Sequence, residues 1–280
     1  MAEMILRLAG VRIRNRRSRP REVRIGTTSL VLLALAAFVG PLFVNYSPNH
    51  LDILNSFEAP SSSHWFGTDN AGRDVFTRVL YGMRTDFIVV TIVTYISLVI
   101  GILLGAVTAY FGGWWDIAVG RFVDSVIAFP FIVLVLAVIA AIGPGLTGVA
   151  IGIVVVDWAL YARLARTEML TIREREYMLA TKTLGYSHTR AIIRHGIPNL
   201  IRSSLVYSTI DVVGNLLLVA AMSYLGFGQQ PPGADLGSII ADGQEYVLTS
   251  WWIATLPGIV LVMIGFAVAL IGDGISEGRI

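Results

Sequence analysis

The sequence predicts an all-α membrane protein with six transmembrane helices and a charged loop between the fourth and the fifth. Of its 280 residues, 55% are hydrophobic and only 14% are charged, and the mean hydropathy is +0.71. An average soluble domain is far more polar than this. Apolar stretches of about 20 residues, the length that crosses a bilayer as a helix, alternate with polar stretches. Cysteine is absent, which excludes disulfides and thiolate metal sites.

Residues 1–26 are expected to form a basic cytosolic arm. Eight arginines lie between Arg7 and Arg24, against only Glu3 and Glu22. A basic run can bind nucleic acid or anionic lipid, but beside an apolar span it is typical of the cytosolic anchor described by the positive-inside rule. The net charge of +2 is too small to indicate nucleic-acid binding. The arm is also too long and too rich in arginine for a cleavable signal peptide, so we expect it to stay attached.

Residues 27–280 are expected to form the membrane domain. The six expected spans are residues 27–45, 87–110, 121–141, 146–164, 198–228 and 251–271. The first is long enough, at about 1.5 Å per residue, to cross the hydrocarbon core with a slight tilt. In the second, Gly101 and Gly105 form a small-xxx-small arrangement that lets another helix approach closely. In the third, Pro130 predicts a kink.

Polar segments join these spans. Residues 46–84 are expected to hold an amphipathic helix at the membrane surface, with Asp74 and Arg78 on its polar face. We interpret the charges of this segment as a structural turn with surface ion pairs. Residues 111–120 are expected to form a tight turn, and residues 229–250 a polar loop.

The lysines and arginines test this layout. All but three of the 21 fall in segments on one side of the membrane, and the exceptions are Arg73, Arg78 and Arg84. By the positive-inside rule, both termini and the charged loop are therefore cytosolic. Arg121 and Asp124, one helical turn apart near that side, are expected to pair at the headgroup boundary.

The charged loop, residues 173–199, interrupts the apolar sequence between the fourth and fifth spans. Residues 176–184 are a helix-compatible run, and Gly185 follows where a left-handed backbone is favoured. Ser187 is the expected N-cap of a second short helix, residues 189–195. Such a segment must face water, and its short helices offer a docking surface rather than a span.

The second short helix is expected to be amphipathic. Ile192 and Ile193 should point to one side, while Arg190 and Arg194, one i,i+4 step apart, should lie on another. Pro198 suits the first turn of the helix that follows.

The spacing of the charged loop resembles the coupling loop of the inner-membrane subunits of binding-protein-dependent ABC importers. That family's pattern is Glu-Ala-Ala, three residues, Gly, nine residues, and a short apolar pair ending in Pro. The matching positions here are Ala180, Gly185, His195, Pro198 and Asn199. Leu179 stands at the position of the family's glutamate and Thr181 at that of its second alanine, so Glu176 is the candidate for the acidic contact.

Other phrases are similar to the peptide-permease branch of this family. They are Phe66-Gly67-Thr68-Asp69 with Gly72-Arg73-Asp74, Tyr110-Phe111-Gly112-Gly113, Phe129-Pro130, and Ser223-Tyr224-Leu225-Gly226-Phe227-Gly228. They stand in the family's order and extend over nearly the whole chain after Asn45. The resemblance is to the C-type subunit of the peptide/nickel branch.

The resemblance implies one transmembrane permease subunit of an ATP-driven importer in the bacterial inner membrane. It implies as partners a sister permease subunit, two ATPase subunits and an extracytoplasmic binding protein that delivers di- or oligopeptides. Closure of the ATPase subunits is expected to move the spans so that a central cavity opens outward and then inward. ATP and Mg²⁺ are expected in those subunits. No cofactor and no catalysis are expected in this chain, which lacks a G-x-x-x-x-G-K-[ST] phosphate loop.

The resemblance also implies which residues contact the ATPase subunits. These residues are Glu176, Tyr177, Ala180, Gly185, Ser187, Arg190, Arg194, His195 and Pro198. The four histidines of the chain show no metal-ligand spacing, so no metal site is expected.

Asp157 and Asp211 fall inside the fourth and fifth expected spans. An ionisable residue within a membrane is a functional candidate, so both are candidates for the substrate path, the alternative being hydrogen bonds to neighbouring helices. A second class of function, a secondary carrier driven by an ion gradient, would use them as coupling carboxylates. The sequence shows no internal repeat of the kind typical of carriers. Within the importer class, nickel chelates and glutathione-like cargo are alternatives to peptides.

Overall fold

The computed structural model describes residues 20–277, which are helical apart from their connections. Its α-helices are α2 (Pro20–Val39), α3 (Val75–Phe111), α4 (Gly113–Ala128), α5 (Phe131–Ile142), α6 (Leu146–Ile172), α7 (Glu176–Thr183), α8 (His188–Ala191), α9 (Ile197–Tyr224), α10 (Leu236–Gly243) and α11 (Trp252–Glu277). Short 3₁₀ turns lie at Gly40–Leu42, Ile53–Asn55 and Gln244–Tyr246, and a π-helical turn at Ile192–Gly196. Within residues 20–277 the only β-type pairing is an isolated bridge between Thr68 and Asp74.

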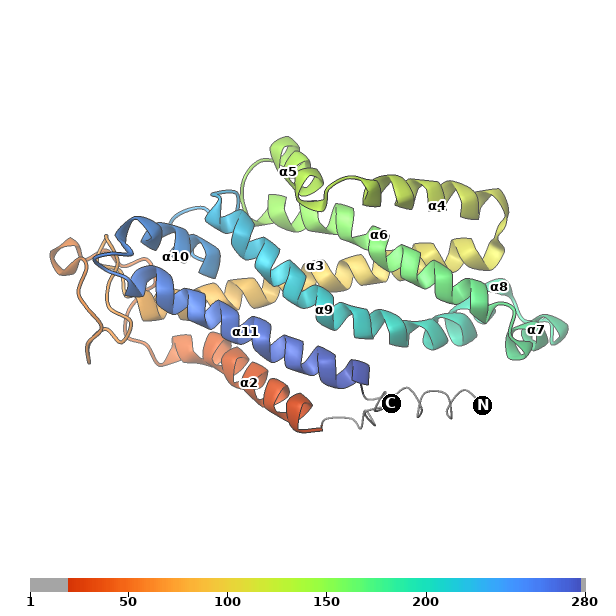
Figure 1. Cartoon of the computed structure of the whole chain (residues 1–280), viewed down its shortest axis with the longest axis horizontal. Helices are drawn as coiled ribbons and strands as arrows, with labels where there is room; N and C mark the ends of the chain where they lie inside the picture. Colours follow the sequence, from red (N-terminus) through yellow and green to blue (C-terminus); the bar gives the residue numbers. More distant parts are fainter. Residues whose placement is uncertain (1–19, 278–280) are drawn as a thin grey trace, which may run out of the picture.

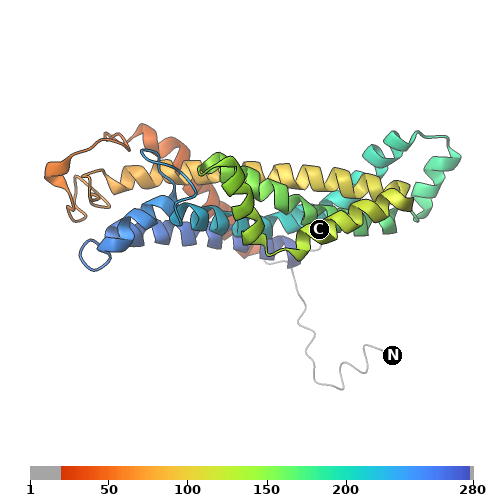
Figure 2. The ribbon, with the colours of Figure 1, turned by 90° about the horizontal axis from the view of Figure 1, so that it is seen from above.

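The helices form an elongated bundle in which the long helices follow one axis (Figures 1 and 2). α7 and α8 lie at one end, which we name the α7 end (Figure 1). The connection after α2 and the short helix α10 lie toward the opposite end, which we name the α10 end. Five helical stretches are long and apolar enough to cross a membrane, and α4 with α5 adds a sixth if that bent pair is one span. The all-α class predicted from the sequence is confirmed.

The first span lies earlier than predicted. α2 and the turn that continues it give a candidate span over residues 21–42, not 27–45. Arg21 and Arg24, which we assigned to the basic arm, are therefore helical. Pro20 begins the helix, a position where its missing N–H costs nothing. Residues 1–19, the rest of the predicted arm, lie outside the described residues.

α3 is one continuous helix of 37 residues, so the prediction of a separate surface helix within residues 46–84 is wrong. Asp74 is its N-cap, and the carboxylate accepts a hydrogen bond from the backbone N of Thr77 at 2.8 Å. No proline interrupts the sequence from there to Phe111. Because extending a helix is much easier than nucleating one, the polar first turns and the apolar span form a single element.

The predicted close approach at Gly101 and Gly105 is confirmed. α3 packs along α6, and a Cβ atom placed on Gly101 would lie 2.5 Å from the carbonyl oxygen of Trp158. A Cβ on Gly105 would collide with the carbonyl oxygen of Ala162. The two backbones are therefore closer than any side chain at these positions would allow.

The third span is broken, not kinked as predicted. α4 and α5 meet at an angle of 94°. Phe129 between them is extended, with ψ 144°, as expected for a residue before a proline, and α5 starts directly after Pro130. The tight turn predicted over residues 111–120 is also wrong. The turn is short and made by Gly112 and Gly113, whose φ angles of +68° and +69° allow α4 to begin directly after α3.

Two ion pairs hold α4 against α6. The Arg166 guanidinium donates to both oxygens of Asp116, at 2.6 and 2.8 Å. Asp124 accepts from Arg163 at 2.6 Å, so its predicted pairing with Arg121 is wrong. The partner of Asp124 is Arg163 on the neighbouring helix α6, and residue spacing within one helix could not indicate this partner.

Helix boundaries around the charged loop and the last loop also differ from the predictions. α8, the π-helical turn and α9 form one helical stretch over residues 188–224, so the second short helix is not separate from the fifth span. Pro198 is accommodated because the hydrogen-bond register shifts at the π-helical turn before it.

The predicted polar loop 229–250 contains α10, which Asp235 and Ser238 start with a capping box. α6 and α11 run past their predicted ends, to Ile172 and Glu277.

We expect Gly101→Val to destabilise the bundle because the added side chain must push α3 away from α6. Overpacking of this kind costs about 1–3 kcal/mol of unfolding free energy. Thermal unfolding of the purified chain in detergent measures the effect. Gly258→Ala is the matched control, since its Cβ meets no atom within 4 Å. Equal stability of the two variants would contradict this account of the packing.

Candidate functional site

The charged loop folds into a short helical hairpin at the α7 end, formed by α7, α8 and the residues between them (Figure 1). The Nη1 atom of Arg173 donates to the carbonyl oxygen of Ala109 at 2.8 Å, which fixes the start of the hairpin against the end of α3. Gly185 turns the chain after α7 with φ +71°, the left-handed conformation that the sequence predicts. The Ser187 hydroxyl caps α8 by accepting from the backbone N of Arg190 at 3.3 Å.

Few side chains of α7 anchor the hairpin to the bundle. Met178 is 1% exposed and belongs to a buried apolar cluster with Met169 and Leu200. Thr181, one turn later, is also buried, and its hydroxyl donates to the carbonyl oxygen of Met178 at 2.7 Å. One face of α7 is therefore fixed on the ends of the long helices, while the rest of it is free to contact another molecule.

The outer side of the hairpin exposes apolar side chains. Tyr177, Leu179, Leu184 and Ile193 are exposed, Leu184 by 68%. The prediction that Ile192 and Ile193 share a face is wrong, because Ile192 is buried and successive residues of a helix point about 100° apart. A group of exposed apolar side chains among charged ones is typical of a protein contact surface.

Aromatic contacts order the basic residues of the hairpin. The Arg190 guanidinium lies over the Tyr186 ring, 4.2 Å from its centroid, in cation–π geometry. Tyr186 in turn stacks on His195, with ring centroids 5.7 Å apart. The Tyr110 hydroxyl, from the end of α3, lies 3.2 Å from Nδ1 of His188. These contacts hold α8 in place without covering its outer face.

The structure places the nine residues that we predicted as ATPase contacts on this hairpin and on the helix that follows it. They are Glu176, Tyr177, Ala180, Gly185, Ser187, Arg190, Arg194, His195 and Pro198, of which all but His195 are exposed. His195 is half-buried, and its Nε2 atom has no hydrogen-bond partner within the described residues. The local sequence pattern was sufficient to bring these residues together.

The two predicted substrate-path carboxylates meet inside the bundle. Asp157 on α6 and Asp211 on α9 interact electrostatically, and Asp157 is 1% exposed, with its Oδ2 atom buried and without a hydrogen-bond partner within the described residues. Oδ2 of Asp211 also accepts from the Tyr161 hydroxyl at 2.8 Å and from Nδ2 of Asn215 at 3.0 Å. Asn215 reaches the hydroxyl of Thr94 at 3.0 Å, so this carboxyl network joins α3, α6 and α9.

Two neighbouring carboxyl groups can share a hydrogen bond only when one of them is protonated. In the part of the chain that the structure describes, no group of three or more acidic or histidine side chains is placed to hold a metal ion. Neither Asp157 nor Asp211 lines the cavity between α2, α3, α9 and α11. The arrangement thus suits helix association in a bilayer, where polar side chains find partners on neighbouring helices.

A second polar cluster lies at the α10 end. Asp69 is 2% exposed and accepts from Nε of Arg73 at 2.6 Å, while Arg78, equally buried, donates to Asp242 at 3.2 Å. Burial raises the pKa of Asp242, and the charges of Arg78 and Arg73 oppose that shift. The turn predicted here exists, since Gly72 has φ +70°. The pairs, however, are largely buried, not at the surface as we predicted.

Sequence reasoning missed three polar residues inside the bundle: Tyr161, Asn215 and Asp86. Tyr161 and Asn215 each lie four residues from a predicted carboxylate, a spacing that would have placed them on the same helix face. Asp86 lies at the predicted start of the second span, and its partner is the backbone N of Leu236, 150 residues away. The only available signal was that an acidic residue stood beside an apolar stretch.

Comparisons with known proteins agree with these features. Residues 97–278 match the family described as "Binding-protein-dependent transport system inner membrane component". The chain is 37% identical over 259 residues to a Brucella suis protein whose name describes a peptide transport system permease, covering 92% of this chain and 87% of that one. The matched family region contains the hairpin, both carboxylates of the carboxyl network and α10.

Two further relatives are similar over nearly the same length. The dipeptide transport system permease protein of Alkalihalophilus pseudofirmus is 35% identical over 252 residues, with 89% of this chain and 81% of the relative covered. The probable D,D-dipeptide transport system permease protein of Escherichia coli is 35% identical over 248 residues, with 89% and 83% covered. The resemblance inferred from the sequence phrases is thereby confirmed.

We expect Tyr161→Phe to lower the free energy of unfolding by about 0.5–1.5 kcal/mol, because Asp211 loses a donor inside the bundle. The unfolding free energy of the chain in bicelles measures this loss. Tyr207→Phe is the control, since the Tyr207 ring packs on Tyr161 with centroids 5.1 Å apart without that hydrogen bond. A loss of the same size in both variants would show that the hydrogen bond contributes nothing.

Proposed function

Because the chain belongs to the family of binding-protein-dependent transport system inner membrane components, we propose that its hairpin docks onto ATPase subunits while its spans pass di- or oligopeptides. The chain is a permease subunit, a transport component of a membrane assembly. In this proposal, ATP and Mg²⁺ are bound by two ATPase subunits. A sister permease subunit completes the path, and an extracytoplasmic binding protein delivers the cargo.

The observation that carries the proposal is the exposed face of the hairpin. Six of the nine predicted contact residues are exposed there, beside the apolar side chains of Leu179 and Leu184, and Arg194 and Pro198 are exposed on the helical stretch that follows. Buried Met178 ties the same hairpin to the long helices. A force applied to the hairpin by a closing partner therefore reaches the spans, as alternating access requires.

The exposed apolar surface of the broken third span supports a sister subunit. Trp114, Trp115 and Ile117 on α4, and Ile132 and Val133 on α5, are all more than half exposed. The two tryptophan rings stack with centroids 4.0 Å apart. In this proposal, the surface contacts a second permease subunit, and the part of it left uncovered contacts lipid.

Peptide cargo is proposed from the relatives, two of which are named for dipeptide transport. The ion-coupled carrier, our alternative from the sequence, needs carboxylates that an ion can reach. Asp157 is 1% exposed and interacts with Asp211 of the carboxyl network inside the bundle, which supports a structural role for this pair instead. Nickel chelates and glutathione-like cargo remain alternatives that uptake assays separate.

We expect Glu176→Lys and Gly185→Val to reduce co-purification of the ATPase subunits by at least about tenfold. The first reverses the acidic contact, and the second places a β-branched residue at φ +71°, where it is strained. Leu248→Lys, at a 99% exposed site toward the α10 end, is the control and should keep the complex intact. Transport that continues after the ATPase subunits are lost would point to the carrier instead.

We expect the hairpin to face the cytosol and the loop after α10 to face the opposite side. Since the chain has no cysteine, single variants report on topology directly. A membrane-impermeant maleimide should label Leu248→Cys in intact spheroplasts, but label Leu184→Cys only after the membrane is disrupted. Both sites are exposed, by 99% and 68%. The reverse labelling pattern would overturn the proposed orientation.

A further inference from the structure

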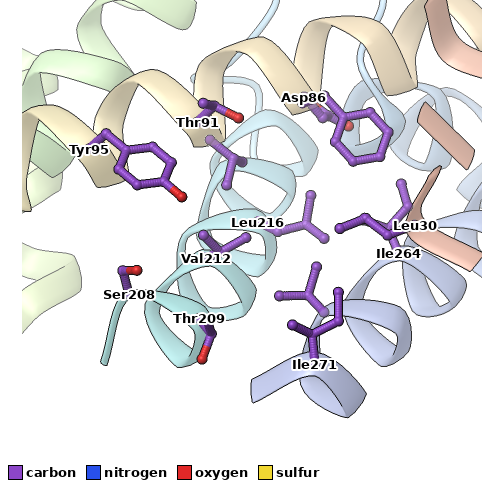
Figure 3. A pocket seen from close by; sticks show the side chains of 13 residues that line it. Leu30, Asp86, Thr91, Tyr95, Ser208, Thr209, Val212, Leu216, Ile264 and Ile271 are labelled. Carbon is purple, nitrogen blue, oxygen red and sulfur yellow. The ribbon is translucent and has the colours of Figure 1, made fainter. Parts of the chain in front are cut away.

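A cavity of about 260 Å³ lies between α2, α3, α9 and α11 (Figure 3). Apolar side chains form most of its wall, among them Leu30, Val212, Leu216, Ile264 and Ile271. Protein interiors are close-packed, and an apolar cavity of about 150 Å³ is already large enough to bind benzene. The present cavity therefore has room for a larger ligand.

Asp86 contributes a carboxylate to this apolar wall (Figure 3). The side chain is 1% exposed, and its Oδ2 atom accepts from the backbone N of Leu236 at 3.1 Å. Its Oδ1 atom is buried and has no hydrogen-bond partner within the described residues. Leaving a buried polar atom unpaired is costly, so this oxygen favours a ligand that donates a hydrogen bond.

A second carboxylate lies near Asp86. Asp235 lies nearby, and both of its oxygens already accept hydrogen bonds, from Ser238, Ser223 and Gln229. The ion pairs described for residues 20–277 include neither Asp86 nor Asp235, although the charge of the buried Arg78 guanidinium acts on Asp235. A cation at Oδ1 would be attracted by the Asp86 carboxylate, whereas an anion would be repelled.

Close backbone packing fixes the carboxylate in position. A Cβ atom placed on Gly82, one turn before Asp86, would lie 3.2 Å from the backbone N of Leu236. A Cβ on Gly237 would collide with the carbonyl oxygen of Ala220 on α9. α3, α9 and the start of α10 therefore meet without intervening side chains, and Asp86 has a defined place at the wall.

We propose that this cavity binds a primary ammonium group attached to an apolar body. The ammonium donates to Oδ1 of Asp86, and the apolar body packs against Val212, Leu216 and Ile264. An amino group of a peptide and the headgroup of an aminophospholipid share this chemistry. The binding site belongs to this chain alone, so it does not depend on the ATPase partners of the proposed function.

The test uses the full chain in phosphatidylcholine nanodiscs, with 2-phenylethylamine as the probe and 2-phenylethanol as its uncharged analogue. Titration calorimetry should show the amine bound at least about tenfold more tightly than the alcohol, because a charge-assisted hydrogen bond is added. Asp86→Asn should abolish that difference. Asp124→Asn, at an exposed carboxylate paired with Arg163, is the matched control and should bind the amine like the unmodified chain.

Val212→Phe provides a second variant, which fills the cavity and leaves the carboxylate intact. It should also weaken amine binding, while thermal unfolding of each variant verifies that the chain is folded. Equal binding of amine and alcohol, no binding of the amine, or an unchanged affinity in a folded Asp86→Asn chain would each overturn the proposal.

Competition then identifies the source of the ammonium group. Displacement of the probe by dileucine, but not by its N-acetylated form, would assign the site to peptides. Displacement when phosphatidylethanolamine replaces phosphatidylcholine would assign it to lipid. Either result supports the ammonium site. Loss of ATPase docking in the hairpin variants leaves these titrations unaffected, so the two proposals fail separately.

Discussion

The contact between α3 and α6 at Gly101 and Gly105 determines how the rest of the bundle is arranged. In a bilayer, lipid tails are as apolar as the side chains, so helices associate through close packing and interhelical hydrogen bonds rather than through a hydrophobic drive. Because these two backbones nearly touch, Thr94 on α3 and Tyr161 on α6 both reach groups on α9. The tight packing and the carboxyl network are thus two parts of one three-helix contact.

α4 is held by a mixture of polar and apolar contacts. Only Asp116 and Val123 of α4 are buried: ion pairs join Asp116 to Arg166 and Asp124 to Arg163, and Val123 packs with Ala159 and Ala162 of α6. The second of these pairs is half-exposed on both sides, and exposed pairs contribute little to stability. α5, in contrast, buries Val135 and Ile139 in the main apolar core, so the two halves of the broken span are held in different ways.

The sequence was sufficient to predict the structure where the interactions involve residues close together in the chain. Gly185 and Ser187 are a helix stop and a helix cap, and the structure has both where the pattern predicted them. Helix ends and buried charges were not predictable in this way, since Arg78 finds Asp242 164 residues later and Asp86 finds a backbone amide 150 residues later. Asp86 was missed for that reason, although an acidic residue beside a membrane span is a functional candidate by its position alone.

The helical stretch over residues 188–224 connects the hairpin to the α10 end and can transmit movement between them. Its 37 residues, at about 1.5 Å each, extend roughly 55 Å. Arg190 occupies one end, and Ser223 at the other is bonded to Asp235 at 2.7 Å. If the end at Arg190 tilts, the end at Ser223 is displaced, and the start of α10 moves with it because Asp235 is hydrogen-bonded to Ser223. The π-helical turn at Ile192–Gly196 breaks the α-helical hydrogen-bond register of this stretch, so we expect a change of angle between the hairpin and α9 to be concentrated there.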